Sequence, residues 1–235
     1  MGKGMVVLVL AAGLLVATDS IAGEIQVLKL SGDVNVRQGV TEVWNRVAVG
    51  DVLRPDDSMK TGPKGSATLA VRTDAGTVKR ITLPPEVIVD LSDIRDLTQD
   101  ELLLKLTMEK VRSSSYEWKE EKATSPNASV IHGANKGSAQ TVENDPAVGA
   151  MQLRGTRVLY ENGYYSTSAL RAMEIFRFYP ALGRDFSNRL LVAEALERAN
   201  LRGESLNEYG AMLGLENLTP EQEALIRARM SALKK

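Results

Sequence analysis

The spacing of apolar positions changes along the chain, from every second residue in the first part to every third or fourth residue in the last. In residues 32–91, short segments rich in Val, Leu, Ile and Thr are interrupted by Gly, Asp and Pro. Residues 66–72 alternate, with Ala67, Leu69 and Val71 on one face and polar side chains such as Thr68 on the other. Such alternation is typical of a β-strand with one buried face.

Turn residues divide this first part into short strands. We expect strands at residues 25–30, 34–36, 43–49, 66–72, 77–83 and 86–91. Gly76, with Asp74 and Ala75, should form the turn of a hairpin, because Gly adopts the positive φ of a tight turn. No gap between these strands is long enough for a crossover helix, which excludes parallel βαβ winding. The pattern therefore predicts an all-β small sandwich or barrel.

Residues 150–235 follow a helical period instead. Tyr160, Gly163, Tyr165, Ala169 and Pro180 occur in an order that resembles the helix-turn-helix of a tetratricopeptide repeat. No further copy follows at the spacing of about thirty-four residues that such repeats have, so we expect a compact bundle rather than a solenoid. A helical pair packed on the β domain or on another protein is the alternative.

Three more helices are expected after this pair, at residues 186–200, 205–213 and 221–233. The last of them has a clear start signal. Thr219 is a favourable N-cap residue, Pro220 suits the first helical position, and Gln222 or Glu223 lies in the first turn.

Residues 97–112 have two interpretations. Thr98 and Glu101 have the spacing of a capping box, and Leu97, Leu104, Met108 and Val111 fall on one helical face, which favours a helix. Leucines at positions 102, 104 and 106 also alternate as in a strand. In either case we expect the apolar face to pack on the β domain.

Together these patterns predict an α+β protein in which the β part precedes an α-helical hairpin or bundle. Four segments are expected: a signal peptide (1–22), a β domain with a terminal helix or strand (23–112), a linker (113–149) and an α-helical domain (150–235). The linker is rich in Ser, Gly and charged residues, and within it only residues 128–131 have the character of a strand, which could extend an edge of the β domain.

The chain opens with features of a secretory signal. Lys3 precedes an apolar run at residues 5–17, and Ser20 and Ala22 supply small residues before a predicted cut between Ala22 and Gly23. An uncleaved anchor is the alternative, although the run is shorter than a membrane-spanning helix needs. We therefore expect a periplasmic or secreted protein without a spanning segment after cleavage.

Composition narrows the classes of fold and partner. The chain has no Cys, so a disulfide scaffold and a lipid-modified N-terminal Cys are excluded. The net charge is −1, which gives no electrostatic reason to expect nucleic acid or an anionic membrane surface as a partner.

Motif order in the β part resembles a known family. The residues concerned are Gly32, Val34, Trp44, Gly50, Asp51, Leu53, Asp57, Thr61, Gly62, Ala67, Leu69, Asp74, Gly76, Val78, Leu83 and Pro84. In this order they resemble the FecR-type domain, the periplasmic β module named after the ferric citrate regulator. The resemblance implies a β fold and a binding or signalling role in the bacterial cell envelope.

Candidate catalytic groups are few. His132 is the only His and lies in the expected linker, so an ordinary zinc site and a Ser-His-Asp triad both lack ligands or a fixed base. Several neighbouring carboxylate groups have the chemistry for acid–base work or Ca²⁺ binding, but we expect them in turns, which Asp commonly stabilises. These groups are Asp56 with Asp57, Asp90 with Asp93 and Asp96, and Glu120 with Glu121. We predict no catalytic, cofactor-binding or metal-binding residue.

Aromatic residues are the remaining candidates. Trp44, flanked by Val43 and Val47, is expected in the core. Trp118 in the linker and the pair Tyr164 and Tyr165 before the helices are candidate contacts with a partner.

The function that these observations favour is a non-enzymatic, exported binding or scaffold protein of the cell envelope, with another envelope protein or cell-wall glycan as partner. An accessory component of envelope signalling related to ferric citrate regulators is one alternative, and an enzyme acting on the cell wall is another. The enzyme predicts a cleft with close acidic groups of shifted pKa, whereas the scaffold predicts an exposed apolar or aromatic patch.

Overall fold

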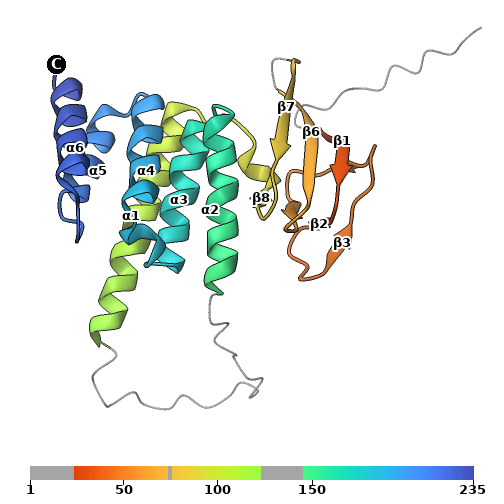
Figure 1. Ribbon diagram of the computed structural model, residues 1–235, viewed down its shortest axis with the longest axis horizontal. Helices are drawn as coiled ribbons and strands as arrows, with labels where there is room; N and C mark the ends of the chain where they lie inside the picture. Colours follow the sequence, from red (N-terminus) through yellow and green to blue (C-terminus); the bar gives the residue numbers. More distant parts are fainter. Residues whose placement is uncertain (1–23, 74–75, 123–144) are drawn as a thin grey trace, which may run out of the picture.

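The protein is an α+β protein, with two antiparallel sheets in its first part and helices in its second. The computed structural model describes residues 24–73, 76–122 and 145–235 (Figure 1). The predicted signal peptide with its cut at Ala22, the residues 74–75 of the hairpin turn, and the linker segment 128–131 with His132 lie outside the described residues.

Eight short strands form two four-stranded sheets with the orders β4-β1-β6-β7 and β3-β2-β5-β8. The strands are β1 (Ile25–Ser31), β2 (Val34–Arg37), β3 (Trp44–Arg46), β4 (Val52–Leu53), β5 (Ser58–Thr61), β6 (Ser66–Arg72), β7 (Val78–Leu83) and β8 (Ile88–Asp90). All paired strands are antiparallel. Buried residues of both sheets belong to one apolar cluster, so the two sheets share a core.

Strand β6 confirms the alternation expected from the sequence. Ala67, Leu69 and Val71 are all buried, while the residues between them are half-buried. β6 pairs with β7 as the predicted hairpin, with Leu69 opposite Ile81. Packing apolar residues of one face against the other sheet is what gives the sandwich its core.

The helical half follows in chain order. It contains the 3₁₀ turn η1 (Leu91–Asp93), α1 (Gln99–Lys122), α2 (Pro146–Glu161), α3 (Tyr165–Phe178), the 3₁₀ turn η2 (Leu182–Arg184), α4 (Phe186–Arg198), α5 (Arg202–Met212) and α6 (Pro220–Leu233). Each helix from α3 to α6 packs on the helix before it, and α1 packs on α3. Figure 1 shows this series running from the sandwich, next to α2, to α6 at the far end.

Helix α1 settles the ambiguity at residues 97–112 in favour of a helix. Its start has the expected capping box, in which the Thr98 backbone N–H donates to Glu101 and the Glu101 N–H donates to the Thr98 hydroxyl. The helix runs on to Lys122, into the segment 113–149 that was expected to be a linker. The helical segment expected from residue 150 starts a few residues earlier, because α2 begins at Pro146 with Asp145 as N-cap.

The buried face of α1 differs from the predicted one. Leu102 and Leu106 are buried in a cluster with side chains of α3 and α4, whereas Leu104 is 63% exposed and Met108 is 46% exposed. The expected packing of α1 on the β domain is therefore wrong. The first turns of α1 carry leucines on several sides, and the side that contacts α3 is the one that becomes buried.

Helix α2 joins the helical half to the sandwich. Gly155 lies so close to β8 that a Cβ atom at this position would be 2.1 Å from the Ile88 carbonyl oxygen. Val158, Leu159 and Tyr164 complete the apolar cluster of the sandwich. The helices thus form a bundle and also pack on the β domain, two arrangements that the sequence left as alternatives.

The later helices agree with their sequence signals. Gly163 has φ = 84° in the tight turn between α2 and α3. Helix α6 begins with a complete capping box between Thr219 and Gln222 and with Pro220 in its first turn. Among the described helices, none combines the length and the apolar character needed to cross a membrane.

Candidate functional site

Arg171 on α3 is the centre of a polar network at the junction of the two halves. Its guanidinium group lies 2.5 Å from Asp90 Oδ2, 3.6 Å from Asp93 Oδ2 and 2.8 Å from Glu174 Oε2. Asp90 ends β8 and Asp93 belongs to η1, so two of these carboxylates come from the β domain. One arginine therefore ties the first helical hairpin to the end of the last strand.

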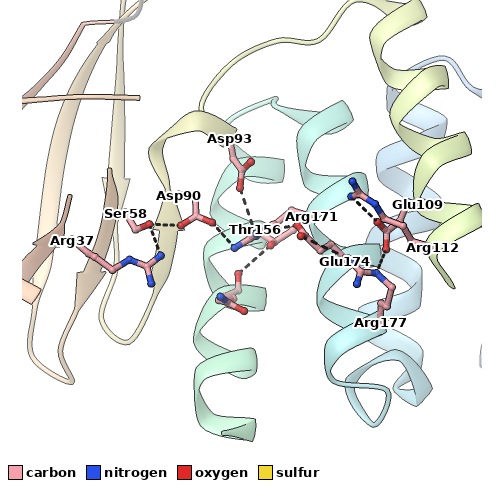
Figure 2. Close-up of polar contacts among 11 residues, drawn as sticks. Arg37, Ser58, Asp90, Asp93, Glu109, Arg112, Thr156, Arg171, Glu174 and Arg177 are labelled. Atoms are coloured by element: carbon pink, nitrogen blue, oxygen red, sulfur yellow. Dashed lines mark hydrogen bonds and ion pairs between the residues drawn. The ribbon is translucent and has the colours of Figure 1, made fainter. Parts of the chain in front are cut away.

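The network continues into the sandwich on one side of Arg171. Figure 2 shows Asp90 accepting a hydrogen bond from the Ser58 hydroxyl, which in turn accepts one from Arg37. Ser58 lies on β5 and Arg37 on the neighbouring strand β2, directly opposite Ser58. Because each polar group is bonded to the next, Ser58 is stabilised although it is 3% exposed.

On the other side of Arg171 the network reaches α1. Glu174 lies 3.9 Å from Arg177, and the Arg177 Nε donates to Glu109 at 2.7 Å (Figure 2). Glu109 is 5% exposed and also faces Arg112 on its own helix at 3.9 Å. A carboxylate buried this deeply is stable only when it is paired, and Arg177 provides that pairing.

A pocket of about 330 Å³ lies beside this network, between η1, α1 and α3. We call it the junction pocket; it is lined by Asp93, Lys105, Met108, Glu109, Arg112, Thr167, Leu170, Arg171 and Glu174. The charged lining residues comprise three carboxylates and three cations. The pocket thus offers charges of both signs around a small apolar surface made by Met108 and Leu170.

Asp93 has an altered proton affinity in this setting. Burial raises the pKa of its carboxyl from 3.8 to about 6, and the charge of Arg171 opposes this rise while Asp90 and Glu174 add to it. A carboxyl in a pocket with a pKa near 6 changes its protonation between weakly acidic and neutral solution.

The raised pKa predicts that stability falls as pH rises through it. Between pH 3.8 and 6 the folded protein holds a proton on Asp93 that the unfolded chain has released, so the free energy of unfolding decreases by up to about 3 kcal/mol over this range. Asp93→Asn should remove this part of the pH dependence. Urea unfolding of both proteins at pH 4.5 and pH 7.5 checks it, and equal pH dependence of the two would contradict the assignment.

Three polar residues of the FecR-like pattern form hydrogen bonds with the backbone of turns and strand ends in the β part. Asp51 Oδ2 accepts from the Ala48 N–H at 2.8 Å, and Asp57 Oδ2 accepts from the Arg54 N–H at 2.9 Å. Thr61 Oγ1 donates to the Pro84 carbonyl and accepts from the Val87 N–H. These polar residues of the FecR-like pattern therefore have structural roles in this fold, as the sequence analysis proposed for Asp57.

The prediction that Trp44 lies in the core is wrong. It is half-buried on the edge strand β3, and both Arg37 and Lys60 lie over its ring, at 5.3 Å and 5.4 Å from the centroid. Its neighbour Val43 is 64% exposed. The indole thus makes cation–π contacts with the charged groups of both side chains, an arrangement that stabilises Trp at a sheet edge.

Tyr164 is not an exposed partner contact, because its side chain is 3% exposed and belongs to the core of the sandwich. Lys79 lies 4.1 Å above its ring. Tyr165 is half-buried and packs edge-to-face on Tyr160. The backbone of Trp118 is part of α1, but its side chain lies outside the described residues, so its role as a contact remains a prediction.

The Tyr164 hydroxyl is buried and has no hydrogen-bond partner among the described residues. Burial, with the charge of Asp96, raises the pKa of this hydroxyl to about 12. Tyr164→Phe removes an unsatisfied polar group while keeping the ring, so we expect the free energy of unfolding to rise by about 1 kcal/mol. Chemical denaturation measures this, and a loss of 1 kcal/mol would show that the hydroxyl has a partner.

Asp90, Asp93 and Asp96, which were expected to stabilise turns, interact with side chains of the helical half instead. Asp90 and Asp93 converge on Arg171, while the charge of Asp96 acts on Tyr164. Within the described part of the chain, no three His, Cys, Asp or Glu side chains come together so that they could hold a metal ion.

Sequence reasoning missed Arg171, Glu174 and Glu109. Arg171 and Glu174 are three residues apart on one face of α3, a spacing that indicates a helical ion pair. The link to Asp90 spans 81 positions, and nothing in a single sequence points to such a contact.

Comparison of the chain with protein-family models, with curated proteins and with solved structures finds no match. The FecR-type and tetratricopeptide resemblances therefore stay predictions drawn from the residues themselves.

Proposed function

We propose that the chain is a non-enzymatic, exported binding or scaffold protein of the bacterial cell envelope, built on a FecR-like β module. The apolar outer face of α1 carries this proposal. Leu104 is 63% exposed and Met108 is 46% exposed, one helical turn apart, and Lys105 and Arg112 flank them. Exposed apolar side chains gathered on one helical face are typical of a surface that binds another protein.

An envelope protein is the partner that fits this face best. Leucine and methionine offer dispersion contacts to apolar side chains, whereas glycans stack on exposed aromatic rings. The flanking cations add a preference for acidic residues on the partner. Cell-wall glycan remains the alternative partner, and a role as accessory component in envelope signalling is compatible with the same surface.

Export and binding are tested together by site-specific photo-crosslinking in living cells. A photoreactive residue replaces Leu104, and the matched control carries it at Leu225 on α6, which is 40% exposed. We expect a crosslinked product of defined mass from position 104 and none from position 225, and a mature N-terminus at Gly23. No crosslinked product from position 104, or identical products from both positions, would refute the binding surface. Recovery of the protein in the cytoplasm would refute export.

A second candidate function is favoured by the junction pocket. Acidic residues line a pocket in which the pKa of Asp93 is raised to about 6 by burial, the feature that the sequence analysis associated with a cell-wall enzyme. Against catalysis, Glu174 and Glu109 are both held in ion pairs at 2.8 Å and 2.7 Å, which favours a fixed structural charge over proton transfer. Release of soluble fragments from purified cell wall by the wild type, and not by Asp93→Asn, would establish the enzyme instead.

A further inference from the structure

The walls of the junction pocket carry opposite charge. On the side of η1 and α3, the lining residues Asp93 and Glu174 share Arg171 as their close cation. Asp90, which does not line the pocket, binds the same guanidinium group. Arg177 is 3.9 Å from Glu174 and pairs with Glu109 instead. Three carboxylates around one guanidinium leave an excess of negative charge. A positively charged ligand group would be stabilised there.

The wall formed by α1 is positive. Lys105 and Arg112 both line the pocket and are two helical turns apart on the same face. The Lys105 ammonium makes no hydrogen bond or ion pair with any residue that the structure describes. Arg112 has a weak ion pair, at 3.9 Å, with Glu109, whose other carboxylate oxygen accepts a hydrogen bond from Arg177. Lys105 thus lies near the carboxyl group of Asp93 without a close ion pair, and Arg112 has only a distant contact with Glu109.

We infer that the junction pocket binds a small zwitterion, with its ammonium group at Asp93 and Glu174 and its carboxylate at Lys105 and Arg112. Met108 and Leu170 would contact a short apolar side chain of the ligand. The volume of about 330 Å³ is at the lower end for ligand sites, which suits an amino acid or a dipeptide. This inference goes beyond the proposed function, because it names a small-molecule ligand for a pocket that shares Met108, Lys105 and Arg112 with the partner-binding face of α1.

Charged groups of both signs in the pocket lining select against molecules with only one charge. An acid without an ammonium group would leave the carboxylates near Asp93 uncompensated, and an amine without a carboxylate would leave Lys105 and Arg112 facing an apolar group. Each missing group should weaken binding about tenfold, equivalent to about 1.4 kcal/mol.

Calorimetric titration of the purified full chain tests this selectivity. The zwitterions are leucine and alanyl-alanine, and the matched single-charge analogues of leucine are 4-methylpentanoate and 3-methylbutylamine. We expect at least one zwitterion to bind, and leucine to bind about tenfold more tightly than either analogue. Absence of binding by both zwitterions up to about 10 mM, or equal affinity for an analogue, overturns the inference.

Variants locate the site. Lys105→Gln and Arg112→Gln should each weaken zwitterion binding about tenfold, because both side chains are solvent-accessible and their loss leaves the packing of α1 intact. Lys110→Gln is the matched control on the same helix, outside the pocket lining, and should change affinity less than about twofold. Equal affinity of all three variants and the wild type overturns the placement.

Release of the Asp93 proton when the ligand binds is a second measurement, and a purely structural role of Asp93 would not produce it. Asp93 is faced by Asp90, Glu174, Arg171 and Lys105, and burial raises its pKa to about 6. A ligand ammonium group beside it lowers that pKa, so leucine or alanyl-alanine should release protons at pH 6, whereas 4-methylpentanoate should not. Titrations in two buffers of different ionisation enthalpy measure this, and zwitterion binding without proton release at pH 6 overturns the proposal.

Discussion

Replacing Gly155 by leucine is expected to destabilise the protein by about 3 kcal/mol or more. A Cβ atom at this position would lie 2.1 Å from the Ile88 carbonyl oxygen and 2.9 Å from Val89 Cγ2. Both atoms belong to β8, and a backbone carbonyl within a paired strand cannot move aside as a flexible side chain can. The helix must therefore separate from the sheet. Urea denaturation measures the loss.

Gly210 provides the control for adding a side chain at a helical glycine, with alanine introduced at both positions. It lies within α5, and apart from its chain neighbours and the backbone of its own helix, no atom comes within 4 Å of a Cβ placed there. Gly210→Ala should leave the fold unchanged and stabilise the helix by about 0.5–1 kcal/mol. If Gly155→Ala behaved like Gly210→Ala, the close approach of α2 to β8 would be wrong.

The second large effect concerns Arg171. Arg171→Met keeps much of the side-chain volume but leaves Asp90, Asp93 and Glu174 without their shared cation, and we expect a loss of about 3 kcal/mol at pH 7.5. The loss should be smaller at pH 5, because Asp93, whose pKa burial raises to about 6, is then protonated and carries no charge. Unfolding by urea at the two pH values tests both statements.

Rescue separates the charge effect from lost packing. Adding Asp90→Asn and Asp93→Asn to Arg171→Met removes two of the stranded charges and should recover most of the stability at pH 7.5. Arg227→Met is the control for an exposed ion pair, since Arg227 is 64% exposed beside Glu223, and should cost less than about 0.5 kcal/mol. A triple variant as unstable as Arg171→Met would show that packing dominates.

Local patterns explain why much of the fold could be predicted. Residues 66–72 alternate because one sheet face is buried, and Thr219 caps α6 because its side chain is within reach of the Gln222 N–H. Both signals act between residues close in sequence. Strand β5 was missed, since Ser58, Met59, Lys60 and Thr61 contain one apolar residue, and the strand is stabilised by polar contacts such as that between Ser58 and Asp90.

The candidate site depends on tertiary contacts that no local pattern contains. Leucines at positions 102, 103, 104 and 106 leave the buried side of α1 undecided until the helix meets α3. The same contact brings Glu109 to Arg177, 68 positions away in sequence, and closes one side of the pocket. Tyr164 was predicted at the surface for a similar reason, because the sandwich that covers it is remote in the sequence.

The junction pocket requires the sandwich and the helices to fold as one unit, and a comparison of two unfolding probes tests this most directly. In a Trp118→Phe variant, Trp44 is the only tryptophan, so its fluorescence reports on the sandwich while circular dichroism at 222 nm reports on the helices. The account predicts one urea transition with the same midpoint for both signals. Two separate transitions, with the sandwich still folded after the helices have melted, would contradict it.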